Sequence, residues 1–147
     1  MEKRENSRRV VVTGLGAITP LGIDVSSTWE GLKKGESGID YITKFDASHF
    51  KCRIGGEVKG FQPEKYIEAK EIKKTDPFVR YGIAASVMAL KDSGLNITEH
   101  NAHRVGVVVG TALAGMTTVE RYHEVLLLHG HKKVTPFFLP MLLGNMA

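Results

Sequence analysis

The stretch VVVTGLGAITPLG, residues 10–22, runs from a β-branched apolar segment into a glycine-rich turn and decides which fold the chain adopts. A dinucleotide site needs a third glycine three residues after the second, so that a helix begins against the pyrophosphate. Thr19 stands in that place after Gly14 and Gly16, and Pro20 biases Thr19 away from helical backbone. No Gly-Lys-Ser or Gly-Lys-Thr follows, which excludes a phosphate-binding loop. The stretch therefore predicts a strand and a structural turn.

Composition indicates one folded domain. The 147 residues are 42% hydrophobic and 24% charged, with one cysteine and a net charge of +4. These values suit a globular core and exclude an internal disulfide framework. The charged start MEKRENSRR leads into no apolar signal-peptide core, so we expect a cytoplasmic chain without a membrane span. The positive charge favours acidic partners, whereas no motif typical of nucleic-acid binding is present.

The expected elements alternate as in an α/β protein. The apolar runs RRVVVTG (8–14) and HRVGVVVGTALAG (103–115) predict two buried strands, the second ending in a glycine-rich turn. Between them lies a long connection, 37–61, with a short strand near Gly56 to Lys59. A helix is expected to follow the second strand over 116–130.

Cap signals mark three further helices. A capping box of Ser27 and Glu30 predicts a helix that ends at Gly35. A short helix is expected from Pro63 to about Lys74. Asp76 caps a longer helix with Pro77 at its first position and Gly94 just past its end. The small residues of this helix let it approach its neighbours closely, which places it near the centre of the fold; they are Gly82, Ala84, Ala85 and Ala89.

The segment VTPFFLPMLLGNMA, 134–147, contains no charged residue. Protein termini are usually polar and exposed. Two clear strands are also fewer than a buried parallel sheet normally contains. We therefore expect the sequence to be part of a longer protein.

Seven blocks follow one another along the chain: RRVVVTGLGAITPLG, STWEGLKKGESGI, FDASHF, DPFVRYGIAAS, ALKDSGL, RVGVVVGTALAGM and KVTPFFLPMLLGNMA. Together they resemble the beta-ketoacyl-acyl-carrier-protein synthases, most closely the type II enzymes of bacterial fatty acid synthesis. The resemblance implies an α/β, thiolase-like fold. Residues 1–147 would form its N-terminal domain, an incomplete first βαβαβαββ half that is truncated before the nucleophile motif.

The resemblance also implies an activity, the elongation of acyl chains by decarboxylative Claisen condensation with malonyl-acyl-carrier protein. The acyl group is held on a cysteine thiolate, and two histidines assist. None of these three residues matches a position in this sequence, so we assign no catalytic residue and expect the chain alone to be inactive. The complete protein is expected to be a homodimer without a cofactor, its substrates being carried on the phosphopantetheine of acyl-carrier protein. The alternative is a noncatalytic partner subunit of the same fold that shapes chain length.

Two other patterns are weaker. Cys52 lies three residues after His49, a spacing that suggests a cysteine and base pair. A lone cysteine is more often an unreactive packing residue, and Cys52 does not match the nucleophile of the family. Glu120 and His123 have the Glu-x-x-His spacing of di-iron bundles, but the second pair is missing, so no metal site is predicted.

Two basic clusters remain. Lys70, Lys73 and Lys74 have the spacing of one helical face, and Lys132 with Lys133 forms a second pair. On charge pattern alone, both are solvated surface. The resemblance implies instead that both clusters contact the acidic helix of acyl-carrier protein.

Three apolar residues are the last candidates. Leu113 lies in the turn after the second predicted strand, and Phe138 and Leu139 lie in the uncharged segment. The resemblance implies that they line the acyl-chain pocket near the dimer interface. Plain core packing is the alternative that the residues themselves leave open.

Overall fold

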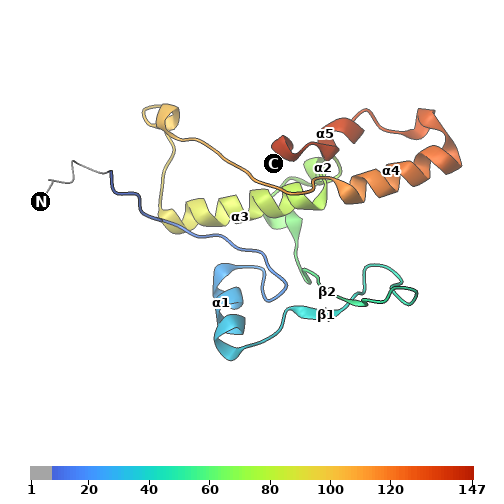
Figure 1. The fold of residues 1–147 in the computed structure, drawn as a ribbon. Coiled ribbons are helices and arrows are strands. Elements are labelled where there is room, and N and C mark those ends of the chain that lie inside the picture. The colour runs from blue at the N-terminus through green and yellow to red at the C-terminus, as the bar shows by residue number, and fades with distance from the viewer. Residues whose placement is uncertain (1–7) are drawn as a thin grey trace, which may run out of the picture.

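The structure, a computed structural model, describes residues 8–147. Three helices form its framework: α1 (Val25–Lys34), α3 (Pro77–Ser93) and α4 (Met116–His129). Two short helices, α2 (Ala69–Ile72) and α5 (Phe138–Leu142), lie beside α3 and α4. Figure 1 shows α3 across the middle of the molecule, with α1 and the strands β1 and β2 on one side of it and α2 and α5 on the other.

The helix ends follow local signals, with one correction. Asp76 and Gly94 cap α3 as predicted: the Asp76 carboxylate accepts from the Phe78 N–H, and Gly94 has φ 65°. Gly35 ends α1 with φ 68°, also as predicted. The predicted capping box is wrong, because Asp24 is the N-cap of α1 and its carboxylate accepts from the Ser27 N–H at 2.7 Å. This hydrogen bond is the main reason why the pKa of Asp24 is lowered.

The two predicted apolar strands do not form among the described residues. Segments 8–14 and 103–115 contain no strand, and Val10 and Val108 are 93% and 98% exposed. A strand requires the N–H and C=O groups of a neighbour in register, and residues 8–147 supply none for these two segments. Beyond the first segment, Thr19 and Gly22 exchange two backbone hydrogen bonds of 2.8 and 3.2 Å, which close the turn around Pro20.

The sheet of the described chain is a small hairpin. Strands β1 (Ile39–Tyr41) and β2 (Ile54–Gly56) pair antiparallel, with Ile39 opposite Gly56, so the strand expected at 56–59 begins two residues earlier. The Glu57 carboxylate fastens the loop after β1 by accepting from the Thr43 hydroxyl at 2.7 Å and the Lys44 N–H at 3.0 Å. The Thr43 hydrogen bond is the largest cause of the lowered pKa of Glu57.

The helix predicted from Pro63 to Lys74 is two separate pieces. A 3-10 turn, η1, covers Pro63–Lys65, and α2 begins at Ala69. Glu68, with φ −61° and ψ 139°, is extended and separates them. Three further 3-10 turns are η2 (Ala102–Arg104), η3 (His131–Lys133) and η4 (Gly144–Met146).

The glycine-rich turn packs directly on α3. A Cβ atom added to Gly14 would lie 2.5 Å from the Ser93 nitrogen, and one added to Gly16 would lie 2.8 Å from the Ala85 carbonyl carbon. Real Cβ contacts are not this short, and backbone atoms cannot rotate away. The small residues of α3 thus allow the close approach that the sequence predicted. Gly14 and Gly16 therefore serve helix packing, which agrees with the predicted structural turn.

We expect Gly16→Ala to lower the free energy of unfolding by about 1–3 kcal/mol, because overpacking forces the turn away from α3. Gly106→Ala is the matched control, since nothing lies within 4 Å of the added Cβ and its φ is not positive. Urea denaturation of both variants, in the protein that carries this chain, measures the difference. Equal stabilities would show that the turn does not depend on this contact.

One buried carboxylate joins α3 to α4. Asp76 and Thr118 are 4% and 3% exposed. One Asp76 oxygen accepts from the Phe78 N–H in α3, and the other accepts from the Thr118 N–H at 3.0 Å and the Thr118 hydroxyl at 2.7 Å. The residue before α4 is Gly115, which has no side chain to cap that helix. Asp76 therefore caps its own helix and the first turn of α4 together.

Asp76→Asn tests this double role. Asparagine is as good an N-cap as aspartate for α3, but it offers one acceptor oxygen in place of two, and a buried donor without its acceptor costs about 1–3 kcal/mol. We expect a loss of that size in the free energy of unfolding, measured with urea. Asp24→Asn makes the same chemical change at the exposed cap of α1 and is expected to have little effect. A similar small effect at both positions would contradict the double cap.

Candidate functional site

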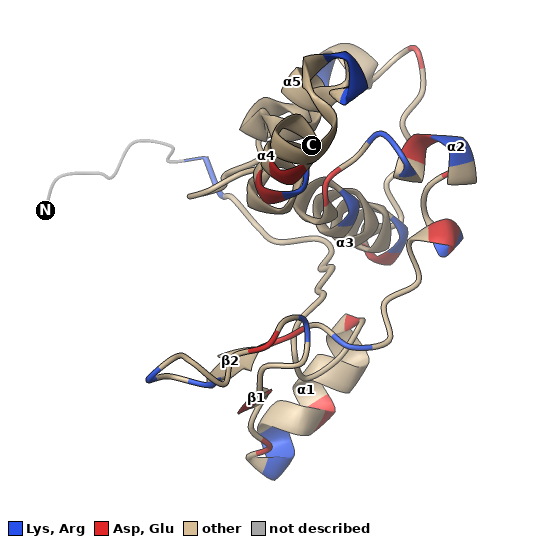
Figure 2. Cartoon of the chain, turned by 90° about the vertical axis from the view of Figure 1, so that its right-hand side faces the viewer, with Lys and Arg blue, Asp and Glu red and all other residues tan. Residues whose placement is uncertain are grey.

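The three lysines predicted to share one helical face lie on and just after α2. Lys70 is within α2, Lys73 is the residue that ends it, and Lys74 follows in the turn toward α3. We call these three residues the α2 lysine cluster. Lys73 is exposed and has no ion pair within residues 8–147, whereas the other two lysines are paired with glutamates. Figure 2 shows a basic and an acidic residue next to each other in α2.

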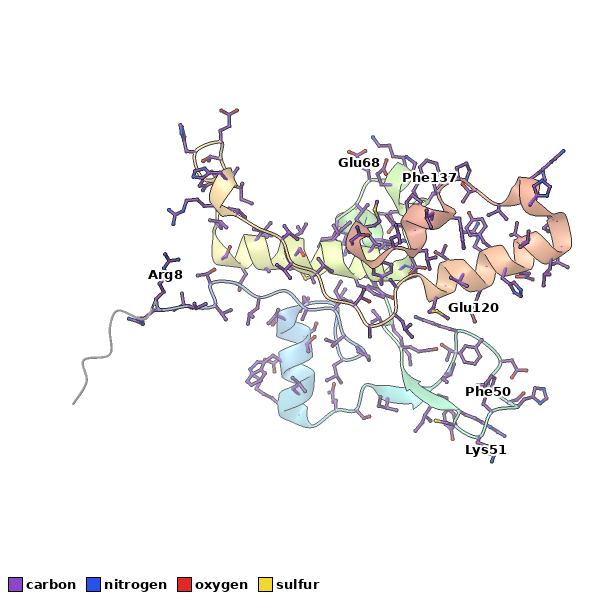
Figure 3. The ribbon with its side chains drawn as sticks, turned by 45° about the horizontal axis from the view of Figure 1, so that its top comes forward. Arg8, Phe50, Lys51, Glu68, Glu120 and Phe137 are labelled. Atoms are coloured by element: carbon purple, nitrogen blue, oxygen red, sulfur yellow. The ribbon has the colours of Figure 1, made fainter. Side chains whose placement is uncertain are left out.

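The α2 lysine cluster borders the segment predicted to line an acyl pocket. The Lys74 ammonium lies 5.3 Å from the centre of the Phe137 ring, a cation–π contact. Glu68 and Phe137 lie on the same side of α3 (Figure 3), and both line a groove of about 760 Å³ together with Ile67, Val79 and Met146. The structure therefore places the lysine cluster beside Phe137, which precedes the predicted pocket residues Phe138 and Leu139 in the chain, whereas these two residues do not line the groove.

The three predicted pocket residues are only partly brought together. The Phe138 ring meets Tyr122 of α4 edge to face, with centroids 5.7 Å apart. The turn that carries Leu113 packs on the end of α5, because a Cβ added to Gly115 would lie 2.6 Å from the Leu142 Cα. Leu113 and Leu139 are nevertheless 75% and 58% exposed. Their role in an acyl pocket stays a prediction.

Lys132 and Lys133 form a second, separate cationic site. They lie in η3 and are exposed. Figure 1 places this turn beyond the C-terminal end of α4, away from α2. A partner that contacts both clusters must therefore cover the surface between α2 and the end of α4.

Cys52, Glu120 and His123 are not joined by other residues of 8–147 into a catalytic or metal-binding group. Cys52 is exposed in the loop before β2, and its thiol donates to the Ile54 carbonyl at 3.6 Å. It does not lie at a helix N-terminus, where a thiolate is stabilised. Glu120 and His123 lie exposed on α4, and the described residues contain no group of three or more His, Cys, Asp or Glu side chains that could hold a metal ion.

Two features of the site were not predicted from the sequence. The pair Glu71–Lys74 has i, i+3 spacing and was readable from the sequence. The contact between Lys74 and Phe137 was not, because it joins residues that lie far apart along the chain and no local pattern encodes it.

Comparison with known proteins establishes the family. Residues 7–147 match the model of the beta-ketoacyl synthase, N-terminal domain. The chain is 46% identical over 141 residues to the 3-oxoacyl-[acyl-carrier-protein] synthase 2 of Vibrio cholerae, an alignment that covers 96% of this chain and 34% of that protein. The corresponding synthase of Coxiella burnetii is 46% identical over 147 residues, covering 100% of this chain and 34% of that protein. The chain belongs to the beta-ketoacyl synthase family and spans about a third of the length of these relatives.

Solved structures confirm the fold. A type II PKS acyl-carrier protein in complex with its ketosynthase matches with a TM-score of 0.74 and 29% identity, over 92% of this chain and 35% of that chain. The ishigamide ketosynthase/chain length factor matches with a TM-score of 0.78 and 28% identity, over 95% of this chain and 35% of that chain. The thiolase-like fold predicted from the seven blocks is therefore correct, and the chain corresponds to the N-terminal portion of these proteins.

None of the helices among residues 8–147 combines the length and the apolar character that a bilayer crossing requires.

Proposed function

We propose that the chain is the N-terminal part of a condensing enzyme that elongates acyl chains in fatty acid biosynthesis by decarboxylative Claisen condensation with malonyl-acyl-carrier protein. The observation that carries this proposal is the position of the α2 lysine cluster beside Phe137 and the groove that Phe137 lines. A carrier protein that docks on the lysines would present its acyl chain next to this segment. The relatives are 3-oxoacyl-[acyl-carrier-protein] synthases, which supports the same activity.

The chain's own residues would serve binding rather than chemistry. The α2 lysine cluster with Lys132 and Lys133 would contact the carrier protein, and Leu113, Phe138 and Leu139 would contact the acyl chain. The nucleophile and its two histidines would be contributed from outside residues 8–147, since Cys52 does not lie at a helix N-terminus, where a thiolate is stabilised. The complete protein is proposed to be a cytoplasmic homodimer that needs no cofactor other than the phosphopantetheine of its carrier.

A second candidate function is a noncatalytic chain-length subunit. The similarity to a ketosynthase/chain length factor structure supports it. The two functions differ in whether the complete protein accepts an acyl group, which mass mapping of acylated peptides after incubation with acyl-carrier-protein thioester decides.

Charge reversal of the α2 lysine cluster tests the docking surface. In the complete protein, Lys70→Glu, Lys73→Glu and Lys74→Glu together should slow association with acyl-carrier protein roughly tenfold or more at low ionic strength, because steering depends on complementary charge. The control is Lys33→Glu, Lys34→Glu and Lys51→Glu, the same charge change on exposed residues outside the cluster. Stopped-flow or surface-plasmon measurements over a salt series give the rates. Unchanged association, or an equal effect of the control, would show that the cluster is only solvated surface.

A further inference from the structure

The α2 lysine cluster carries its own anions. Glu68 Oε2 lies 2.7 Å from Lys70 Nζ, and Glu71 Oε1 lies 3.1 Å from Lys74 Nζ. Within this surface, three cationic side chains therefore stand beside two anionic ones, and Lys73 is the lysine without an ion pair among residues 8–147. The cluster is far less positive than the spacing of its lysines suggests.

These two ion pairs are weak enough to be exchanged. The side chains of Lys70 and Glu68 are mostly exposed, and those of Lys74 and Glu71 are somewhat under half exposed. Exposed pairs of this kind contribute about 0–1 kcal/mol, so water and an arriving anion compete with them readily. A partner carboxylate that binds Lys70 or Lys74 must displace Glu68 or Glu71, or share the lysine with it, and it meets repulsion from the glutamate as it approaches.

We propose that Glu68 and Glu71 are specificity-determining residues of the docking surface, which act as internal competitors for its lysines. They weaken the attraction of any single anionic group and favour a partner that presents several carboxylates at once. Docking is consequently modest in affinity and readily reversed. This inference rests on the proposed function, because it concerns the surface proposed to bind acyl-carrier protein.

The two lysines differ in what else holds them. Lys74 keeps the Phe137 ring as a second contact when Glu71 is neutralised. Lys70 has no second side-chain contact of this kind within the described chain. Glu71→Gln therefore removes a competing charge while Lys74 stays in place, which makes it the cleaner variant.

The test measures binding of acyl-carrier protein to the complete protein with Glu71→Gln. We expect about two- to fivefold tighter binding at low ionic strength, expressed mainly in faster association, and the gain should vanish at high salt. Glu71→Asp keeps the negative charge and should bind like the unmodified protein. Glu64→Gln is the matched control, because Glu64 is exposed in η1 and has no ion pair among residues 8–147, so its effect should be smaller.

Each other result overturns the inference. Weaker binding of Glu71→Gln would mean that Glu71 positions Lys74 for the partner rather than competing for it. Unchanged binding, or an equal gain with Glu64→Gln, would mean that the ion pairs play no part in selection. The triple lysine-to-glutamate variant separates these outcomes from failure of the docking surface. If it binds acyl-carrier protein normally, the proposed function of the surface is wrong. If it binds poorly and Glu71→Gln binds as the unmodified protein does, only the proposed competition is wrong.

Discussion

The buried Asp76 carboxylate is the constraint on which the rest of the structure depends. It accepts hydrogen bonds from the first turns of both α3 and α4. If the two helices moved apart, this buried carboxylate would lose hydrogen bonds or become exposed to water. Each helix then positions other parts of the chain. The glycine-rich turn rests on α3 through Gly14 and Gly16, and the Phe138 ring at the start of α5 rests on Tyr122 of α4.

This junction also explains why the candidate docking surface and the candidate pocket segment are neighbours. Lys74 lies two residues before Asp76, so the helix junction fixes the end of the α2 lysine cluster. Phe137 lies beside Phe138, whose ring is held by α4. The contact between Lys74 and Phe137 thus links the segment before α3 to the segment that packs on α4. A surface that carries three lysines and an apolar segment are therefore held side by side.

Features that depend on nearby residues could be predicted from the sequence, and those that depend on distant partners could not. Asp76, Pro77 and Gly94 give the ends of α3 because caps act within one turn. The predicted strand at 8–14 does not form among the described residues, because strand formation needs a neighbour that no local pattern supplies. The spacing of Lys70, Lys73 and Lys74 predicted that they cluster. Their ion pairs with glutamates and the contact of Lys74 with Phe137 could be found only in the structure. The family was recognisable because seven blocks occur in order, although no single block is specific.

We propose that residues 8–147 provide the docking and pocket surfaces and that the catalytic nucleophile lies elsewhere in the complete protein. The most direct measurement is to incubate the 147-residue chain with acyl- and malonyl-acyl-carrier protein, then to quantify ketoacyl product and map acylated peptides by mass spectrometry. We predict no product and no acyl group on Cys52, because oriented catalytic groups supply about 7–11 kcal/mol of barrier lowering in favourable cases and we propose that these groups lie outside residues 8–147. Ketoacyl product, or acylation of Cys52 at catalytic rates, would contradict this assignment.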